Sequence, residues 1–279
     1  MQTLERPITV GIDGTTTSQP AIDWAADTAL RHDLPLKLVY VIDSPGPRVG
    51  YDYISRELDE AGADAATRAR DAALAGHPGL TVQTATVNDD STHALINESD
   101  HASMIVVGSR GHSGFYDMVI GSTSLHTAMH AHCPVAVIRP RTDDPANPAR
   151  GRVVVGVSSS PYAVHALGLA FEEAALRGVG LTAVHVRPRH GDAAKDEAAL
   201  AAMFDPWTKR YPAVDVDRVD LDGDPAKVLT QFSNGAELLV SGCRGHGGVA
   251  GLLRGSTSQA MLHHAGCPVL VVHDHDPVG

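Results

Sequence analysis

Residues 108–138 of the chain match residues 242–272 without a gap, and about half of the paired positions are identical. A second match pairs Val10–Asp13 with Val155–Ser158. Repetition over such a length indicates that one structural unit occurs twice, which restricts the fold to two copies of one domain. The length of 279 residues agrees with this, because domains typically contain about 100–150 residues. The polar, proline-bearing segment Arg141–Arg150 is typical of a linker, so we expect domains at residues 1–141 and 150–279.

Within each half, short apolar runs alternate with segments whose apolar residues recur at helical spacing. Runs such as Ile105–Val107 and Leu238–Val240 lack polar alternation, as in strands covered on both faces. Strands that alternate with helices predict a parallel sheet with right-handed crossovers, so each half is expected to be a five-stranded α/β sandwich. In the first half we expect strands at residues 8–12, 36–42, 80–87, 104–107 and 135–139, and helices at about 22–30, 53–76, 94–100 and 122–132.

Each copy of the repeat carries the motif Gly-x-x-Gly-(nine residues)-Gly-Ser. Its first glycine closes an apolar strand and its last glycine opens a helix, so the motif lies where open parallel sheets bind ligands. Glycine allows a ligand to approach the backbone closely, and a helix start offers free N–H groups to an anion. Arg110 and Arg244 add a cation to each loop. The Ser-Thr-Ser sequence at the helix start also suits a plain N-cap, but two copies with identical spacing favour a phosphate site.

Competing motifs do not fit the chain. It contains no Gly-Lys pair and therefore no P-loop, and no glycine elbow around a serine indicates an acyl-transfer triad. The segment Gly245–Ala250 matches the dinucleotide pattern G-x-G-x-x-A. However, it falls in the fourth strand–helix connection of its half, and its counterpart at Gly111–Ser113 breaks the pattern.

The repeated motif, the His-Ala-x-Cys-Pro-Val segment that follows it and the first strand Val10–Asp13 together resemble the universal stress protein family. The resemblance covers essentially the whole chain and is to the tandem-domain, ATP-binding members that are frequent in actinobacteria. It implies a Rossmann-like fold of the adenine nucleotide alpha-hydrolase type. The second half departs from the family at Ser158, where the aspartate of the first strand is replaced, and the first half departs at Asp89–Thr92.

The resemblance assigns the nucleotide contacts residue by residue. In the first half they fall on Gly11, Asp13, Val41, Gly108, Ser109, Arg110, Gly111, His112, Gly121, Ser122 and Thr123. In the second half they fall on Gly156, Ser158, Val186, Gly242, Arg244, Gly245, His246, Gly255, Ser256 and Thr257. His112 and His246 are included because they lie within the loops, where either phosphate contact or plain exposed polarity explains them.

The charge balance limits the partners of the chain. The net charge of −11 argues against binding to nucleic acid or to an anionic membrane, both of which need a basic surface. Three cysteines are too few for a disulfide scaffold, and no signal-peptide core or membrane-length apolar run is present, so we expect a cytoplasmic protein.

The chain has 16 histidines, and His126, His130 and Cys133 have ligand-like spacing, repeated in part by His263, His264 and Cys267. Zinc needs three or four converging ligands, and the family resemblance makes this segment a structural entry to the last strand. We therefore expect core packing here and no metal. Trp24 and Trp207 are expected to pack under helices, and the charged stretch Arg56–Asp71 to be a solvated helix face.

The resulting interpretation is a protein that binds ATP, with or without Mg²⁺, in each half and acts as a nucleotide-dependent stress-response regulator. It implies a regulatory protein partner that the sequence does not identify. Two alternatives stay open: a slow ATPase or phosphate- or adenylyl-transferring enzyme, and a nucleotide-free interaction module. The short apolar last strands, around Val137 and Val271, are expected to pair with each other, and a homodimer of two chains is expected.

Overall fold

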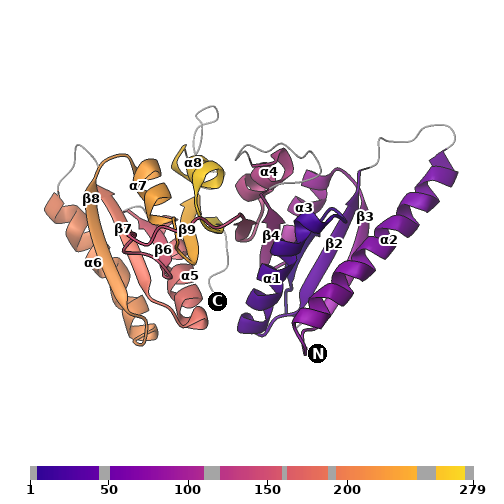
Figure 1. Cartoon of the computed structure of the whole chain (residues 1–279). Coiled ribbons are helices and arrows are strands. Elements are labelled where there is room, and N and C mark those ends of the chain that lie inside the picture. The colour runs from indigo at the N-terminus through magenta and orange to yellow at the C-terminus, as the bar shows by residue number, and fades with distance from the viewer. Residues whose placement is uncertain are drawn as a thin grey trace. The chain divides into compact units, whose positions relative to one another are not determined.

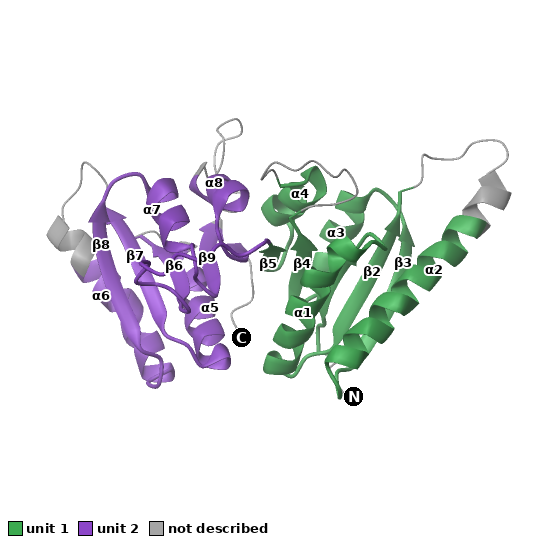
Figure 2. Ribbon diagram, in the orientation of Figure 1, with its two compact units in different colours: residues 1–138 green, residues 139–279 purple. Residues whose placement is uncertain are grey.

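The computed structural model describes residues 5–43, 51–109, 120–158, 162–187, 193–243 and 256–273. It divides into two compact units, residues 1–138 and 139–279 (Figure 2). Among the described residues, no helix combines the length and apolarity that crossing a membrane requires.

The first unit contains one parallel sheet with the strand order β3-β2-β1-β4-β5 (Figure 1). Its strands are β1 (Ile8–Ile12), β2 (Leu36–Ile42), β3 (Val82–Asn88), β4 (Met104–Gly108) and β5 (Val135–Ile138). Its helices are α1 (Gln19–His32), which follows the short 3-10 helix η1 (Thr16–Ser18), α2 (Tyr51–Gly76), α3 (Ser91–Ser99) and α4 (Ser122–His130). The five-stranded α/β prediction is confirmed.

The second unit repeats this architecture with the strand order β8-β7-β6-β9-β10, again entirely parallel. Its strands are β6 (Val153–Val157), β7 (Leu181–Arg187), β8 (Val216–Asp222), β9 (Leu238–Cys243) and β10 (Val269–His273). Its helices are α5 (Tyr162–Arg177), α6 (Ala193–Arg210), α7 (Pro225–Phe232) and α8 (Ser256–His264). The tandem architecture is therefore confirmed, whereas pairing between the last strands of the two units stays a prediction.

The strand register of the first unit separates the two faces of its sheet. Gly11 pairs with Val39, and the space beside Gly11 is filled by Leu95 of α3. The next pair, Ile12 and Tyr40, belongs to the opposite face, where the Tyr40 ring packs against Gly62 of α2. Because successive side chains of a strand point to opposite faces, α2 and α3 cover different sides of the sheet.

Local sequence explains the helix starts. Asp90 precedes α3 and accepts hydrogen bonds from the N–H groups of Thr92 (2.9 Å) and His93 (3.1 Å), and this bonding lowers the pKa of the Asp90 carboxyl. Asp224 precedes α7 and accepts from Ala226 N–H at 2.9 Å. The two halves differ in sequence at this turn, yet an aspartate caps the helix in both.

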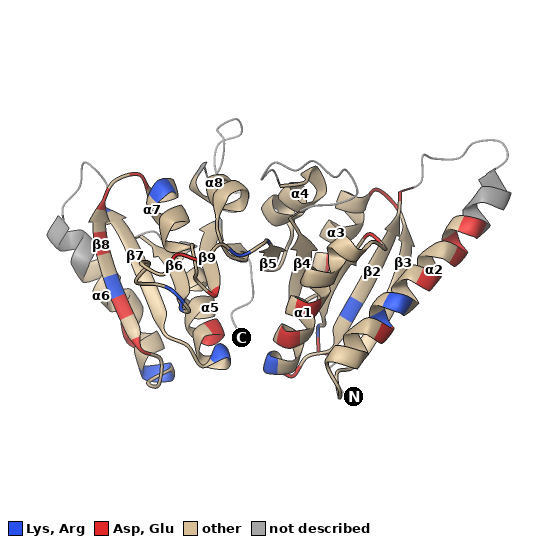
Figure 3. Ribbon diagram, viewed as in Figure 1, with Lys and Arg blue, Asp and Glu red and all other residues tan. Residues whose placement is uncertain are grey.

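The burial of side chains in α1 and α2 can be compared with the burial that the helical pattern predicts. Trp24 is buried as expected, but Leu30, which fits the apolar spacing of α1, is 44% exposed. Residues 57–60 of α2 are exposed, and Figure 3 shows acidic and basic residues along this helix, so the solvated face is confirmed. In the second unit Trp207 of α6 packs against Gly168 of α5, where an added Cβ would lie 2.5 Å from the ring.

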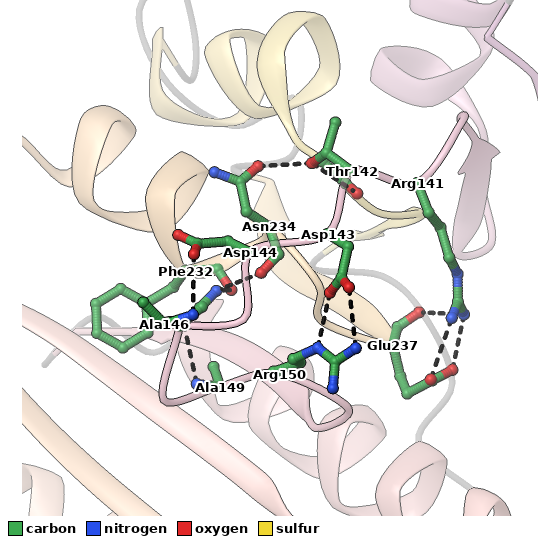
Figure 4. A network of polar contacts seen from close by, with 12 residues as sticks. Arg141, Thr142, Asp143, Asp144, Ala146, Ala149, Arg150, Phe232, Asn234 and Glu237 are labelled. Atoms are coloured by element: carbon green, nitrogen blue, oxygen red, sulfur yellow. Dashed lines mark hydrogen bonds and ion pairs between the residues drawn. The ribbon is translucent and has the colours of Figure 1, made fainter.

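The segment expected to be a linker is packed on the second unit. We call residues 139–150 the connecting segment. Arg141 forms two hydrogen bonds with the Glu237 carboxylate, at 3.1 and 2.7 Å (Figure 4). Thr142 N–H donates to Gly266 O at 2.8 Å. Ala149 is fully buried. The polar side chains that indicated a linker instead form hydrogen bonds to helix ends and turns of the second unit.

Candidate functional site

The candidate site of the first unit lies at the carboxyl ends of β1 and β4. These strands are neighbours in the sheet although β2 and β3 separate them along the chain. After β1 the chain continues to β2 on one side of that strand, and after β4 it continues to β5 on the opposite side, so the strand order reverses between β1 and β4. Open α/β sheets bind ligands beyond the carboxyl ends of the strands at such a point. In the second unit β6 and β9 have the same relationship.

Both ends of the first glycine loop are held at one point. Ser109 follows β4, and its N–H donates to Ile138 O at 2.8 Å. The carbonyl of Ser109 accepts a hydrogen bond from Gly121 N–H at 3.0 Å. The loop thus leaves the sheet and returns to it at Ser109, which itself is 8% exposed.

Helix α4 follows the loop directly, and the residue at its start, Gly121, has no side chain. Gly121 occupies the N-cap position with an extended backbone and cannot cap the helix through a side chain. The first N–H groups of a helix have no partner within the helix, so they remain donors for an anion. Ser124 ties this helix start to the strand end, since its hydroxyl donates to Gly108 O at 2.7 Å. Ser258 makes the same contact with Gly242 O at 3.4 Å in the second unit.

Asp13 is held by a cluster of hydroxyl groups that the sequence reasoning missed. Its Oδ1 accepts hydrogen bonds from Thr15 N–H (2.9 Å), Thr15 Oγ1 (2.7 Å) and Ser18 Oγ (2.6 Å). Its Oδ2 accepts from Thr17 Oγ1 at 3.2 Å. The signal was present, because an aspartate before Gly-Thr-Thr-Thr-Ser favours a turn closed by its own side chain. Ser158, at the matching position of the second unit, is exposed.

The other described candidates lie beside these groups. Val41 comes directly after Tyr40, the partner of Ile12, so it is level with Asp13, and Val186 has the same place beside Ser158. Both valines are half-buried. Ser122 is exposed and Thr123 half-buried in the first turn of α4, and Thr257 is half-buried in α8, which begins at Ser256.

Seven candidates lie outside the described residues. They are Arg110, Gly111, His112, Arg244, Gly245, His246 and Gly255.

Gly11 and Gly156 have a packing role that sequence reasoning did not foresee. A Cβ added to Gly11 would lie 3.0 Å from two methyl carbons of Leu95, and one added to Gly156 would lie 2.8 Å from Leu229 Cδ1. Both leucines are buried, and they occupy matching places in α3 and α7. The absent side chain thus lets each helix approach the first strand of its unit. Contact with a nucleotide remains a prediction for both glycines.

We expect Gly156→Ala to destabilise the second unit by about 1–3 kcal/mol, because the added methyl overpacks the contact with Leu229. Urea unfolding followed through Trp207 fluorescence, in a Trp24→Phe background, measures this change. Gly76→Ala in the first unit, where nothing lies within 4 Å of an added Cβ, should leave the transition reported by Trp207 unchanged. Adding Leu229→Val should recover part of the loss; an unchanged unfolding midpoint for Gly156→Ala contradicts the packing role.

The histidine and cysteine residues are explained by local contacts. His126 and His130 stack with ring centroids 6.2 Å apart, and His126 Nδ1 lies 2.9 Å from Ser122 O. Cys133 and Cys267 are buried, and burial raises the pKa of the Cys267 thiol to about 12. Core packing is confirmed for these two cysteines, but it is wrong for His126, His130 and His264, which are exposed. Within the described ranges, no three His, Cys, Asp or Glu side chains gather in a way that could hold a metal ion.

The fold and the paired glycine loops define a tandem α/β protein with a candidate anion site at the switch point of each sheet. The universal stress protein family matches residues 5–139 and 149–273, and the chain therefore belongs to this family. A universal stress protein of Mycobacterium tuberculosis is 35% identical over 285 residues, covering 95% of this chain and 96% of the relative.

Two solved structures extend the comparison. A universal stress protein from Archaeoglobus fulgidus has a TM-score of 0.73 and 22% identity, covering 96% of this chain and 99% of that chain, and it shares the fold. A universal stress protein in complex with cAMP is 24% identical with a TM-score of 0.39, covering 49% of this chain and 99% of that chain.

Proposed function

We propose that the protein binds ATP at the carboxyl end of each sheet and acts as a nucleotide-dependent regulator of a stress response in the cytoplasm. The start of α4 carries the proposal: Gly121 leaves the helix N–H groups uncapped directly beside the end of β4. The positive end of the helix dipole at this point favours phosphate. A second glycine motif with the same spacing in the other unit supports one nucleotide for each half.

In this proposal the ribose and base extend from the α4 start toward β1 and β2. Asp13 follows the end of β1, where its carboxylate can accept a hydrogen bond from a hydroxyl of the nucleoside. Val41 is level with Asp13 on the neighbouring strand and offers backbone groups to the base. Bound nucleotide then changes the affinity for a partner protein by binding two conformations of the chain unequally. A homodimer of two such chains belongs to the same proposal.

The environment of Asp13 favours binding over hydrolysis. A general base must be able to take a proton from water, and the Oδ1 atom of Asp13 already accepts three hydrogen bonds from its own turn. The carboxylate is therefore suited to position a ligand hydroxyl, and the regulator is preferred to the enzyme.

We expect the two sites to bind ATP unequally, with the second site weaker by roughly tenfold or more. Ser158 cannot supply the charge-assisted hydrogen bond that Asp13 offers, and such a bond contributes about 1.5–3 kcal/mol. Titration calorimetry of the full chain should resolve two affinities. Asp13→Asn should weaken the first site toward the second, and Ser158→Asp should strengthen the second.

The asparagine variant is chosen because its amide oxygen still accepts from Thr15 and Ser18, so the turn is kept while the charge is lost. Asp23→Asn is the matched control: this exposed aspartate of α1 accepts a hydrogen bond from the Gln19 side chain at 2.8 Å and is not among the candidate site residues. Two identical sites, or an Asp13→Asn chain that binds as tightly as its parent, would refute the assignment of Asp13. Absence of any bound ATP would refute the proposed function itself.

A further inference from the structure

Arg139 caps the end of α8 in the second unit. It follows β5 directly and is 9% exposed. Its guanidinium donates to three backbone carbonyls: Ala265 O at 2.9 Å, His263 O at 2.8 Å and Leu262 O. These carbonyls belong to the last turn of α8 and the residue after it, so one side chain satisfies most of the free acceptors at this helix end.

This cap is important for the stability of α8 because the helix is short. It has nine residues, and an isolated helix of that length is not stable in water. A buried cation at the C-terminus both pairs with the free carbonyls and complements the negative end of the helix dipole. The other end of α8 begins at Ser256, where the second glycine loop ends. The end that Arg139 caps and the start proposed for the second anion site thus belong to one short helix.

Asn147, in the same connecting segment, holds α7. Its side-chain amide donates to Phe232 O at 2.9 Å, Asn234 O at 2.6 Å and Gln231 O at 3.3 Å, all at the C-terminal end of that helix. Helix α7 packs against α8 and carries Leu229, which contacts Gly156 two residues before Ser158. The connecting segment thus anchors both helices that bear on the second site.

The same segment begins at the base of the first glycine loop. Ile138, the residue before Arg139, pairs with Gly108 and accepts the hydrogen bond from Ser109 N–H at 2.8 Å. The carbonyl of Ser109 in turn binds Gly121 N–H, at the start of α4. The peptide between Ile138 and Arg139 therefore joins the base of the first loop to the residue that caps α8.

We propose that the connecting segment couples the two nucleotide sites, and that Arg139 is the positioning residue that passes occupancy of the first loop to α8. The proposal rests on the proposed function, because it requires ATP at the first loop. ATP there reduces the freedom of Ser109 and Ile138, which favours the capped state of α8 and prepares the second anion site. Coupling of this kind is reciprocal, and it typically changes affinity by about fivefold or more.

Hydrogen exchange of α8 amides in the full chain tests the coupling. Gly255→Glu is introduced to disable the second loop, so that added ATP reaches α8 only through the first site. Exchange of residues 256–265 should then slow by about threefold or more when ATP saturates the first site, since a firmer cap lowers the population of the opened helix. In the same background Arg139→Gln should abolish this ATP-dependent gain while calorimetry still shows ATP bound at the first site, weakened by no more than the coupling factor.

Arg141→Gln is the matched control. It removes an arginine two residues further along the same segment that bonds to Glu237 instead of a helix end, and the gain should persist. Protection that persists in Arg139→Gln overturns the coupling, as does ATP bound at the first site without any gain in the parent chain. If the parent binds no ATP at all, the proposed function fails and the coupling fails with it.

Discussion

Replacing Gly121 by glutamate is expected to lower the ATP affinity of the first site by about 100-fold, or about 2.7 kcal/mol at 1.4 kcal/mol for each factor of ten. The backbone at Gly121 (φ −64°, ψ 150°) suits any residue, and an added Cβ would meet only Ser124 Oγ, at 3.9 Å. The new carboxylate would lie beside the free N–H groups of α4, where the positive end of the helix dipole favours a negative charge. The helix thus keeps or gains stability while its own side chain replaces the phosphate.

Calorimetry should show the binding stoichiometry falling from two ATP to one, with the second site as an internal reference. Gly121→Gln is the matched control, because it adds almost the same volume without the charge and should weaken binding less. A Gly121→Glu chain that still binds two ATP with the parent affinities would show that the α4 start is not the phosphate site. Thermal unfolding at or above the parent temperature excludes loss of fold as the cause.

A fragment that begins at residue 150 is expected to be less stable than one that begins at residue 139 by at least about 3 kcal/mol. The shorter fragment loses the charge-assisted bonds from Arg139, which contribute about 1.5–3 kcal/mol, and the neutral bonds from Asn147, at about 0.5–1.5 kcal/mol each. It also loses the buried Ala149 when cut at that point. Because a domain is stable by only about 5–15 kcal/mol, the shorter fragment should be marginal at 37 °C.

Urea unfolding of the two fragments, followed by circular dichroism, measures the difference. Arg150→Gln in the longer fragment is the control: its ion pair with Asp143 is exposed, so the unfolding midpoint should not change measurably. Equal midpoints for the two fragments would mean that the connecting segment contributes nothing to the second unit. In that case the domain boundary expected at residue 150 would be the functional one.

The strands and helices followed closely from local pattern. The uninterrupted apolar runs in β4 and β9 indicated strands covered on both faces, and residues 105–107 and 238–240 are buried in the structure. The ends of some strands differ from the prediction where a turn interrupts the apolar pattern. Leu80 was expected to start a strand, but it is buried in a turn in which its N–H donates to His77 O at 3.3 Å, and β3 begins at Val82.

In the candidate site, too, some features follow from the sequence and others only from the tertiary structure. The sequence by itself determined the duplication, the parallel α/β fold and the positions of the glycine motifs, since these depend on periodicity, composition and short-range turn chemistry. Only the tertiary structure decided that Gly11 makes room for Leu95, that Gly156 makes room for Leu229 and that Arg139 caps α8. Each of these contacts joins residues more than 70 positions apart in the sequence. Their partners are chosen by how helices pack on the sheet, and no local pattern specifies which distant side chain fills a given space or meets a given carbonyl.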